Sequence, residues 1–206
     1  TEFGLSSLVL KEIPYKNQAF IHIREVQPGF FKEHLTECVS FCRMCGADWI
    51  DAAGHAYLEK YPLITALYRM QRSREGLEQT DACVFPVTPD NVQTWLDIYN
   101  ERMADVPNAA HMDSADGREL LKTGDGYFIH RDGQLLGIGK AAGDFIDTVI
   151  AVQPGMGETV VLALASLLTE DTVKLMVAGA NTKAVRLYER MGFVKVKELT
   201  RWYRVL

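Results

Sequence analysis

The stretch Val152-Gln153-Pro154-Gly155-Met156-Gly157 joins an apolar run to a helix-forming one, and its first four residues occur twice in the chain. The other copy stands at residues 26–29. Each copy is followed by a helical pattern and by a short apolar run that ends in Ala-Gly, at 53–54 and at 178–179. The valine and the final glycine are 28 positions apart in the first copy and 27 in the second. This matching order and spacing predicts two related strand-turn-helix-strand units.

The two copies differ immediately after the tetrapeptide. The second copy has a further glycine at Gly157, whereas the first has Phe30 and Phe31 in the corresponding place. A glycine turn before a helix that begins near Glu158 allows backbone N–H groups and the positive end of the helix dipole to face an anion. We therefore expect the chemistry in the second copy, and we interpret the first copy as structural.

Composition limits the classes of function. The chain has 206 residues, of which 48% are hydrophobic and 24% are charged, so it fits one large or two small domains. Its net charge of −5 disfavours nucleic-acid and membrane-surface partners, which require a basic surface. No apolar run reaches the roughly 18 residues of a membrane-spanning helix, and the first residues lack a signal-peptide pattern. We expect a cytoplasmic protein.

The hydrophobic pattern predicts a sequence of short strands and helices. In the first part of the chain we expect strands at 8–13, 19–26 and 49–53, a helix at 31–45 and a mainly helical stretch at 55–70. In the second part we expect strands at 83–87, 127–130, 134–140, 145–152, 173–178 and 193–205, and helices at 91–104, 117–122, 158–168 and 182–191. The polar stretch 72–80 is expected to link two domains, at 1–76 and 77–206.

Three cysteines share one face of the first predicted helix. Cys38, Cys42 and Cys45 are spaced at i, i+4 and i+7, and His34 is the only further metal ligand nearby. A metal site needs more ligands at defined spacing, whereas a free cysteine behaves as a small apolar residue. The sequence therefore favours core packing for these cysteines, and we expect no metal.

The segment at residues 181–193 carries the most specific signal. It reads Asn-Thr-Lys-Ala-Val-Arg-Leu-Tyr-Glu-Arg-Met-Gly-Phe. This resembles the C-terminal motif of the GNAT acetyltransferase superfamily, whose members show Asn, Ala, Leu-Tyr-Glu and Gly-Phe in this order and spacing. The resemblance covers about residues 81–206, and residues 1–76 resemble the latter half of the same fold. It implies an α/β (α+β) fold with a mixed, mostly antiparallel sheet flanked by helices, preceded by a partial, degenerate repeat.

The resemblance also implies a function. It suggests an N-acetyltransferase that transfers an acetyl or other acyl group from acetyl-CoA to an amine of a small molecule or peptide. The protein would act as a monomer or homodimer. The pantetheine arm of acetyl-CoA would pair with the backbone between the strands that end at Val152 and Ala178. The residues implied in cofactor binding are Ile150, Ala151, Val152, Gly155, Met156, Gly157, Glu158, Thr159, Asn181 and Ala184.

Catalytic roles follow from the same resemblance. Tyr188 would donate a proton to the departing thiolate, and a backbone N–H within 150–152 would stabilise the oxyanion. Asp147 is the nearest carboxylate before the glycine turn and is the candidate general base, with a water chain as the alternative. Structural interpretations stay open for two residues, because Tyr188 also suits an apolar core and Asn181 is a good helix N-cap.

An alternative function is a catalytically inactive GNAT-like module for binding or assembly. The turn at 153–157 is one residue shorter than the usual turn of the superfamily and has no Arg or Lys, and Glu158 adds a negative charge. In the other direction, residues 181–206 carry seven Lys or Arg against two Glu, which suits a phosphate-rich ligand. The sequence leaves both functions open.

Overall fold

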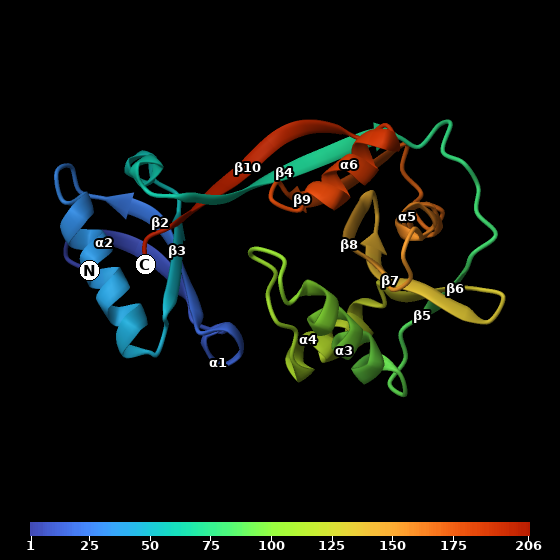
Figure 1. Cartoon of the computed structure of the whole chain (residues 1–206), viewed down its shortest axis with the longest axis horizontal. Coiled ribbons are helices and arrows are strands. Elements are labelled where there is room, and N and C mark those ends of the chain that lie inside the picture. The colour runs from blue at the N-terminus through green and yellow to red at the C-terminus, as the bar shows by residue number, and fades with distance from the viewer. The chain divides into compact units, whose positions relative to one another are not determined.

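The computed structural model describes residues 1–206, and the chain divides into two compact units (Figure 1). The first unit comprises Thr1–Leu67 and Leu199–Leu206, and the second comprises Tyr68–Glu198. Two strands, β4 (Leu63–Ser73) and β10 (Val194–Arg204), contribute residues to both units. Each unit has its own hydrophobic core.

The sheet of the first unit combines antiparallel and parallel pairs. β1 (Gly4–Val9) runs antiparallel to β2 (Gln18–Val26), and the short helix α1 (Ile13–Lys16) joins them. β3 (Trp49–Ala53) runs parallel to β2, and the end of β10 pairs antiparallel with β3. The parallel pair is joined by α2 (Phe31–Met44), as a parallel connection requires.

Helix α2 covers the core of the first unit with one apolar face. Leu35, Cys38 and Cys42 are buried there at helical spacing, against β2 and β3. Cys45, just after the helix, is exposed. The core-packing interpretation is therefore confirmed for Cys38 and Cys42 and is wrong for Cys45.

A buried carboxylate ties three strands of the first unit together. Asp51 of β3 is fully buried and accepts hydrogen bonds from Gln18 Nε2 at 2.7 Å and from Arg204 Nε at 2.6 Å. The Arg204 guanidinium also lies 4.8 Å from the centre of the Trp49 ring. A buried charge is tolerated only when it is paired and hydrogen-bonded, and these contacts meet that requirement.

The second unit is built on a sheet with the strand order β10-β4-β9-β8-β7-β6-β5. Its remaining strands are β5 (Cys83–Pro86), β6 (Gly126–Arg131), β7 (Gln134–Ala142), β8 (Phe145–Ala151) and β9 (Thr172–Ala178). β5 to β8 form successive antiparallel pairs, and β8 runs parallel to β9. The hairpin turn Asp132-Gly133 has φ values of 51° and 75°, as the two-residue turn of a hairpin requires.

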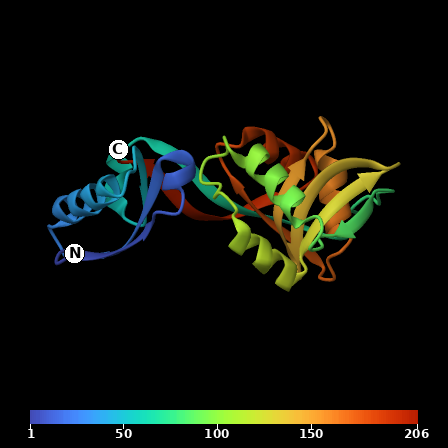
Figure 2. The ribbon, with the colours of Figure 1, turned by 90° about the horizontal axis from the view of Figure 1, so that it is seen from below.

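Four helices pack on this sheet. α3 (Val92–Met103) and α4 (Ser114–Thr123) share an apolar cluster with Phe128 and Ile138. α5 (Gly157–Ala165) and α6 (Thr182–Arg190) pack in a separate cluster with β8 and β9. Figures 1 and 2 show α3 and α4 on one side of the strands and α5 on the other. The predicted α/β class, with a mixed and mostly antiparallel sheet flanked by helices, is confirmed.

Two predictions of secondary structure in the first part of the chain are wrong. Residues 55–70 were predicted to be mainly helical, but only the 3₁₀ helix η1 (Ala56–Lys60) is helical, and β4 follows Pro62. Pairing within the sheet outweighs the weak helix preference of this stretch. The strand predicted at 8–13 lies earlier, as β1 at Gly4–Val9, and Ile13 begins the helix α1. Pro14 is the second residue of this helix, where its fixed φ and missing N–H are tolerated.

The other predicted elements agree with the structure to within a few residues, although β4 takes the first two residues of the predicted linker 72–80. None of the helices has the length and apolar character needed to cross a membrane.

Candidate functional site

The parallel strands β8 and β9 stay paired only at their beginnings. Their register joins Phe145 with Lys174 and Ile146 with Leu175, and then the pairing ends. β8 remains paired on its other side with β7 as far as Ala151. Beyond Ile146 the edge of β8 that faces β9 is therefore free of strand partners.

A cavity of about 850 Å³ lies beside the end of β8. Its lining comes from the end of β8, the glycine turn, α6 and the end of α3. It brings together most of the residues predicted to bind the cofactor or act in catalysis. These are Ile150, Ala151, Val152, Gly155, Gly157, Asn181, Ala184 and Tyr188.

The glycine turn leaves several backbone donors unused. Gly155 has a φ of +83°, and the Met156 N–H donates to the Gln153 carbonyl at 3.3 Å. Met156 then precedes α5 without any side-chain cap, so the N–H groups of residues 157–159 have no partner in the helix. The first N–H bonded back within the helix is that of Val160, to the Met156 carbonyl at 3.0 Å.

Three predicted cofactor residues of this turn do not line the cavity with their side chains. Met156 is partly buried against the core, and Glu158 is exposed. Thr159 has intermediate exposure. In contrast, a Cβ atom at Gly157 would lie 2.8 Å from Leu187 Cδ2, so glycine keeps this wall of the cavity open. Any contact of residues 158 and 159 with a ligand in the cavity would come from their backbone.

The backbone of β8 presents alternate groups to the open side. The Val152 N–H donates to the Leu136 carbonyl of β7 at 2.8 Å, and a Cβ atom at Gly137 would lie only 2.4 Å from the Ile150 carbonyl oxygen. Both groups therefore point toward β7. Because the groups of successive residues alternate in direction along an antiparallel pair, the N–H of Ala151 points the other way, toward the gap. Within 150–152, Ala151 is thus the available donor.

Tyr188 combines the two interpretations that the sequence left open. Its side chain is 6% exposed, and its ring centre lies 5.9 Å from that of Phe193, so it belongs to the core. It also lines the cavity. Burial raises the pKa of the Tyr188 phenol to about 12, so it is protonated at neutral pH. A protonated phenol at the cavity wall is suited to donate a proton.

Asn181 is partly buried and precedes the first residue of α6. Its side-chain oxygen accepts a hydrogen bond from the Ala184 N–H at 3.2 Å, which confirms the predicted N-cap. Asn181 and Ala184 both line the cavity with Tyr188, as their spacing on one helical face requires. The cap fixes the beginning of α6 and with it the direction of this wall.

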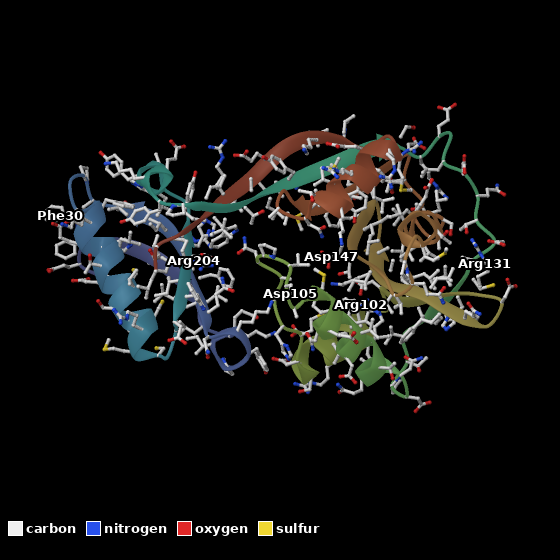
Figure 3. All side chains as sticks on the ribbon, viewed as in Figure 1. Phe30, Arg102, Asp105, Arg131, Asp147 and Arg204 are labelled. Carbon is white, nitrogen blue, oxygen red and sulfur yellow. The ribbon has the colours of Figure 1, made fainter.

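The charges in the cavity wall are all positive. Arg102 of α3 and Lys183 of α6 line it, and no Asp or Glu does, although the chain carries a net charge of −5. Arg102, which is labelled in Figure 3, donates from Nη2 to the Val152 carbonyl at 3.3 Å. Sequence reasoning missed Arg102, because it lies 50 positions before the turn that it contacts. The cavity therefore favours an anionic ligand.

Asp147, the predicted general base, does not line the cavity. Its side chain is 46% exposed, and its Oδ2 lies 3.9 Å from Lys140 Nζ, which also lies 3.6 Å from Asp125. It shares a face of β8 with Val149 and Ala151, which do line the cavity. A proton would need an intervening water to pass from the cavity to Asp147.

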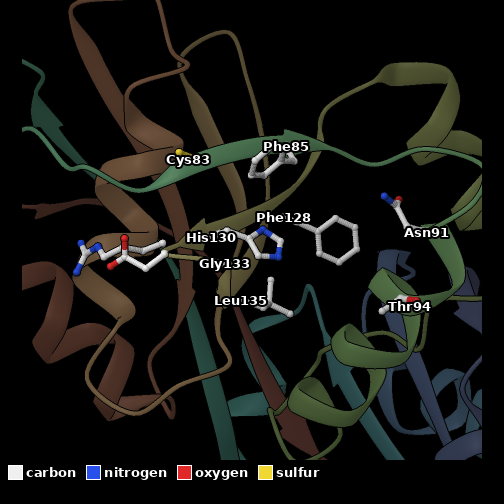
Figure 4. A pocket seen from close by; sticks show the side chains of 10 residues that line it. Cys83, Phe85, Asn91, Thr94, Phe128, His130, Gly133 and Leu135 are labelled. Carbon is white, nitrogen blue, oxygen red and sulfur yellow. The ribbon is translucent and has the colours of Figure 1, made fainter.

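A second cavity of about 610 Å³ lies between β5, the β6–β7 hairpin and the start of α3 (Figure 4). Its wall is mainly apolar and includes Phe85, Phe128 and Leu135. The guanidinium of Arg131 at its rim is paired with Asp81 at 2.7 Å. None of the predicted site residues lines this cavity.

The architecture is that of known acetyltransferase structures. A GCN5-related N-acetyltransferase from Sphaerobacter thermophilus aligns with a TM-score of 0.61 at 15% identity, over 97% of this chain and 75% of that one. A GCN5-related N-acetyltransferase from Anabaena variabilis aligns with a TM-score of 0.61 at 12% identity, over 91% of this chain and 54% of that one. A tandem GNAT protein from the clavulanic acid biosynthesis pathway aligns with a TM-score of 0.52 at 14% identity, over 91% of this chain and 74% of that one. The chain therefore has the GNAT fold.

The sequence comparison points to the same superfamily. The family model for FR47-like protein matches residues 151–203, which include the glycine turn, β9, α6 and most of β10. A comparison with curated proteins gives no significant match. The resemblance to the GNAT superfamily is confirmed, and its matched segment contains the residues that line the cavity on the α5 and α6 side.

Proposed function

We propose that this protein is an N-acetyltransferase that transfers the acetyl group of acetyl-CoA to an amine of a small molecule or peptide. The observation that carries the proposal is the composition of the cavity beside β8. It combines unpaired amides at the start of α5, two cations without a carboxylate, and a buried, protonated phenol. A polyanionic thioester needs these three features for binding and for release of its thiolate.

The cofactor would bind along the open edge of β8. Pantetheine amides would donate to the backbone carbonyl groups of Val149 and Ala151 along this edge, as an added strand does, which leaves the Ala151 N–H for the thioester carbonyl. The diphosphate would accept hydrogen bonds from the N–H groups of residues 157–159, at the positive end of the α5 dipole. Lys183 would supply the positive charge that the glycine turn at 153–157 lacks. The side chain of Glu158 is exposed, so its charge is screened by solvent.

The reaction would then proceed by direct transfer. The nitrogen of the neutral amine attacks the thioester carbonyl carbon, and the Ala151 N–H stabilises the resulting oxyanion. The C–S bond breaks as the intermediate collapses, and the departing thiolate takes the proton of Tyr188. The proton lost by the amine leaves through water, with Asp147 as the candidate acceptor. The products are the N-acetylated amine and CoA. The phenolate left on Tyr188 regains a proton from water, which balances the proton that the amine released.

The first unit would have a structural role as a degenerate half of the same fold, with 77–206 as the acyltransferase domain. In the first unit β2 and β3 are paired along five positions, from Gln18–Trp49 to His22–Ala53. A Cβ atom at Gly54, just beyond β3, would lie 2.2 Å from the Ile23 carbonyl oxygen, so the two chains remain close there. Strands that stay together leave no edge for a pantetheine.

Thermal unfolding with acetyl-CoA tests the proposal. A ligand at 100 times its dissociation constant adds about 2.7 kcal/mol of stability, which raises the melting temperature by several degrees in a chain of this size. Lys183→Ala should reduce this shift, whereas Arg186→Ala should not, because Arg186 lies on the same helix but outside the cavity wall. The absence of any shift in the wild type at millimolar acetyl-CoA would contradict the proposal.

An inactive binding module is the second candidate, because the predicted base lies outside the cavity wall. Release of free CoA during incubation with acetyl-CoA and a panel of amines and peptides separates the two functions. Binding without amine-dependent release of CoA would favour the inactive module.

A further inference from the structure

Arg102 links the end of α3 to the beginning of the glycine turn. Its Nη2 donates to the Val152 carbonyl at 3.3 Å, and its side chain is 44% exposed. Its Nε lies 4.0 Å from Glu101, whose side chain is 73% exposed, so this ion pair is weak. A guanidinium carries five N–H donors in a rigid fork. The Val152 contact leaves donors free for a ligand in the cavity that Arg102 lines.

The contact also joins two walls of the cavity. Val152 follows the last residue of β8, and its N–H is already bound to β7, so its position is fixed by the sheet. On the other side, Met103 and Val106 line the cavity in the segment that continues from Arg102. This segment leads from α3 to α4. Arg102 therefore holds the wall formed by Met103 and Val106 against the strand end at which the glycine turn begins.

The turn itself offers no cation. Residues 153–157 include neither Arg nor Lys, and the nearest charge in sequence is the acidic Glu158. Arg102 brings a positive charge to this turn from a distant helix. Its position in the last turn of α3 is favoured by the helix dipole, whose negative end attracts cations.

We propose that Arg102 anchors the phosphates of the cofactor and, through the same guanidinium, positions the Met103–Val106 wall for the acceptor amine. This inference rests on the proposed function. An Arg fork can donate to a phosphate oxygen and to the Val152 carbonyl at the same time, which a lysine ammonium does less well. Through this shared guanidinium, the bound cofactor holds the end of α3 and the wall that continues from it.

Calorimetric titration of two donors tests the phosphate contact. Acetyl-CoA carries the diphosphate and nucleotide, and acetyl-pantetheine carries neither. Arg102→Ala should weaken acetyl-CoA binding by about 10- to 100-fold, the range expected for a charge-assisted hydrogen bond, and leave acetyl-pantetheine binding nearly unchanged. Arg102→Lys should recover part of the loss. Arg118→Ala is the matched control, because Arg118 is exposed on α4, outside the cavity wall, and donates only to Ser114 Oγ at 3.5 Å.

Steady-state kinetics test the positioning role. At saturating acetyl-CoA, Arg102→Ala should raise KM for the amine several-fold while kcat changes less, and Arg102→Lys should restore the amine KM only in part. A variant with equal losses for both donors, or one that behaves as Arg118→Ala does, would overturn the inference and leave the proposed function in place. A wild type that binds neither donor would overturn both. Melting temperatures without ligand show whether each variant is folded.

Discussion

The two Val-Gln-Pro-Gly segments fold into the same turn. In the first, the Phe30 N–H donates to the Gln27 carbonyl at 3.1 Å, and Gly29 has a φ of +87°. In the second, the Met156 N–H donates to the Gln153 carbonyl at 3.3 Å, and Gly155 has a φ of +83°. A turn with proline second and a positive-φ glycine third is of type II. A helix begins two residues after the glycine in both, at Phe31 and at Gly157.

The surroundings of the two turns differ. The Phe31 ring lies 4.7 Å from His55 and 5.4 Å from Tyr57, and it stands where the second copy has Gly157. β2 and β3 pair along five positions, whereas β8 and β9 pair along two. The same local sequence therefore sets the turn, while the side chain after it and the pairing of the flanking strands differ between the two copies. The expected activity depends on those two features.

The largest expected effect concerns Tyr188, which has no recognisable counterpart in the first copy. Tyr188→Phe removes the phenolic proton and keeps the ring that packs against Phe193. Turnover should fall by about 10²- to 10⁴-fold, the usual contribution of a general acid, while acetyl-CoA affinity changes little. Rates of CoA release at saturating donor and amine provide the measurement. Unchanged turnover would remove Tyr188 from the mechanism.

The second prediction converts one turn into the other. Gly157→Phe reproduces the residue found at Phe31, where the same turn accepts it, and Gly157 has no positive φ to forbid a side chain. The new ring would fill the cavity beside Leu187. The stabilisation of about 2.7 kcal/mol expected at 100 times the dissociation constant of acetyl-CoA should then disappear.

Gly157→Ala is the milder control for this conversion. Its methyl group would meet only the flexible end of Leu187, at 2.8 Å. It should keep much of the shift in melting temperature with acetyl-CoA. A Gly157→Phe protein that shows the wild-type shift would mean that the cofactor does not use this cavity.

Sequence patterns were sufficient for elements whose local signals agree with their packing. Helix α6 is an example, because its N-cap Asn181, its apolar face and the following glycine all predict the same boundaries. The motif in this helix also identified Tyr188 and Ala184, which the structure places at the cavity wall. A role for these residues in catalysis or binding stays a prediction.

The failures occur where distant contacts decide. The stretch that forms β4 has a helix-compatible pattern, and its strand state depends on partners far away in sequence. Likewise, nothing around Arg102 in the sequence indicates that its guanidinium reaches Val152. The available direction of the Ala151 N–H required the register of β7 and β8. Each of these features depends on tertiary pairing, which periodicity does not encode.

The smallest expected effect concerns acid stability and should be confined to the first unit. His34 of α2 is fully buried, and Thr1 Oγ1 and Ser6 Oγ lie 2.7 Å from its two ring nitrogens. Burial is the main cause that lowers the pKa of His34 below its usual 6.5, against the opposing effect of Glu37. The unfolded chain therefore binds a proton at a higher pH than the folded one. Stability from this group is present above about pH 6.5 and is lost as the pH falls.

This loss can be at most about 1.4 kcal/mol per pH unit for one histidine. Denaturant unfolding of the wild type and of His34→Gln at pH 7.5 and 5.5 measures it, with hydrogen exchange in α2 and α5 reporting on each unit. His22, whose pKa burial also lowers, lies in the first unit too and contributes in the same direction. Substitution of His34 should thus reduce the acid effect in α2 without abolishing it. Equal acid sensitivity of α2 in the wild type and the variant would show that the buried His34 imidazole does not cause the loss of stability of the first unit at low pH.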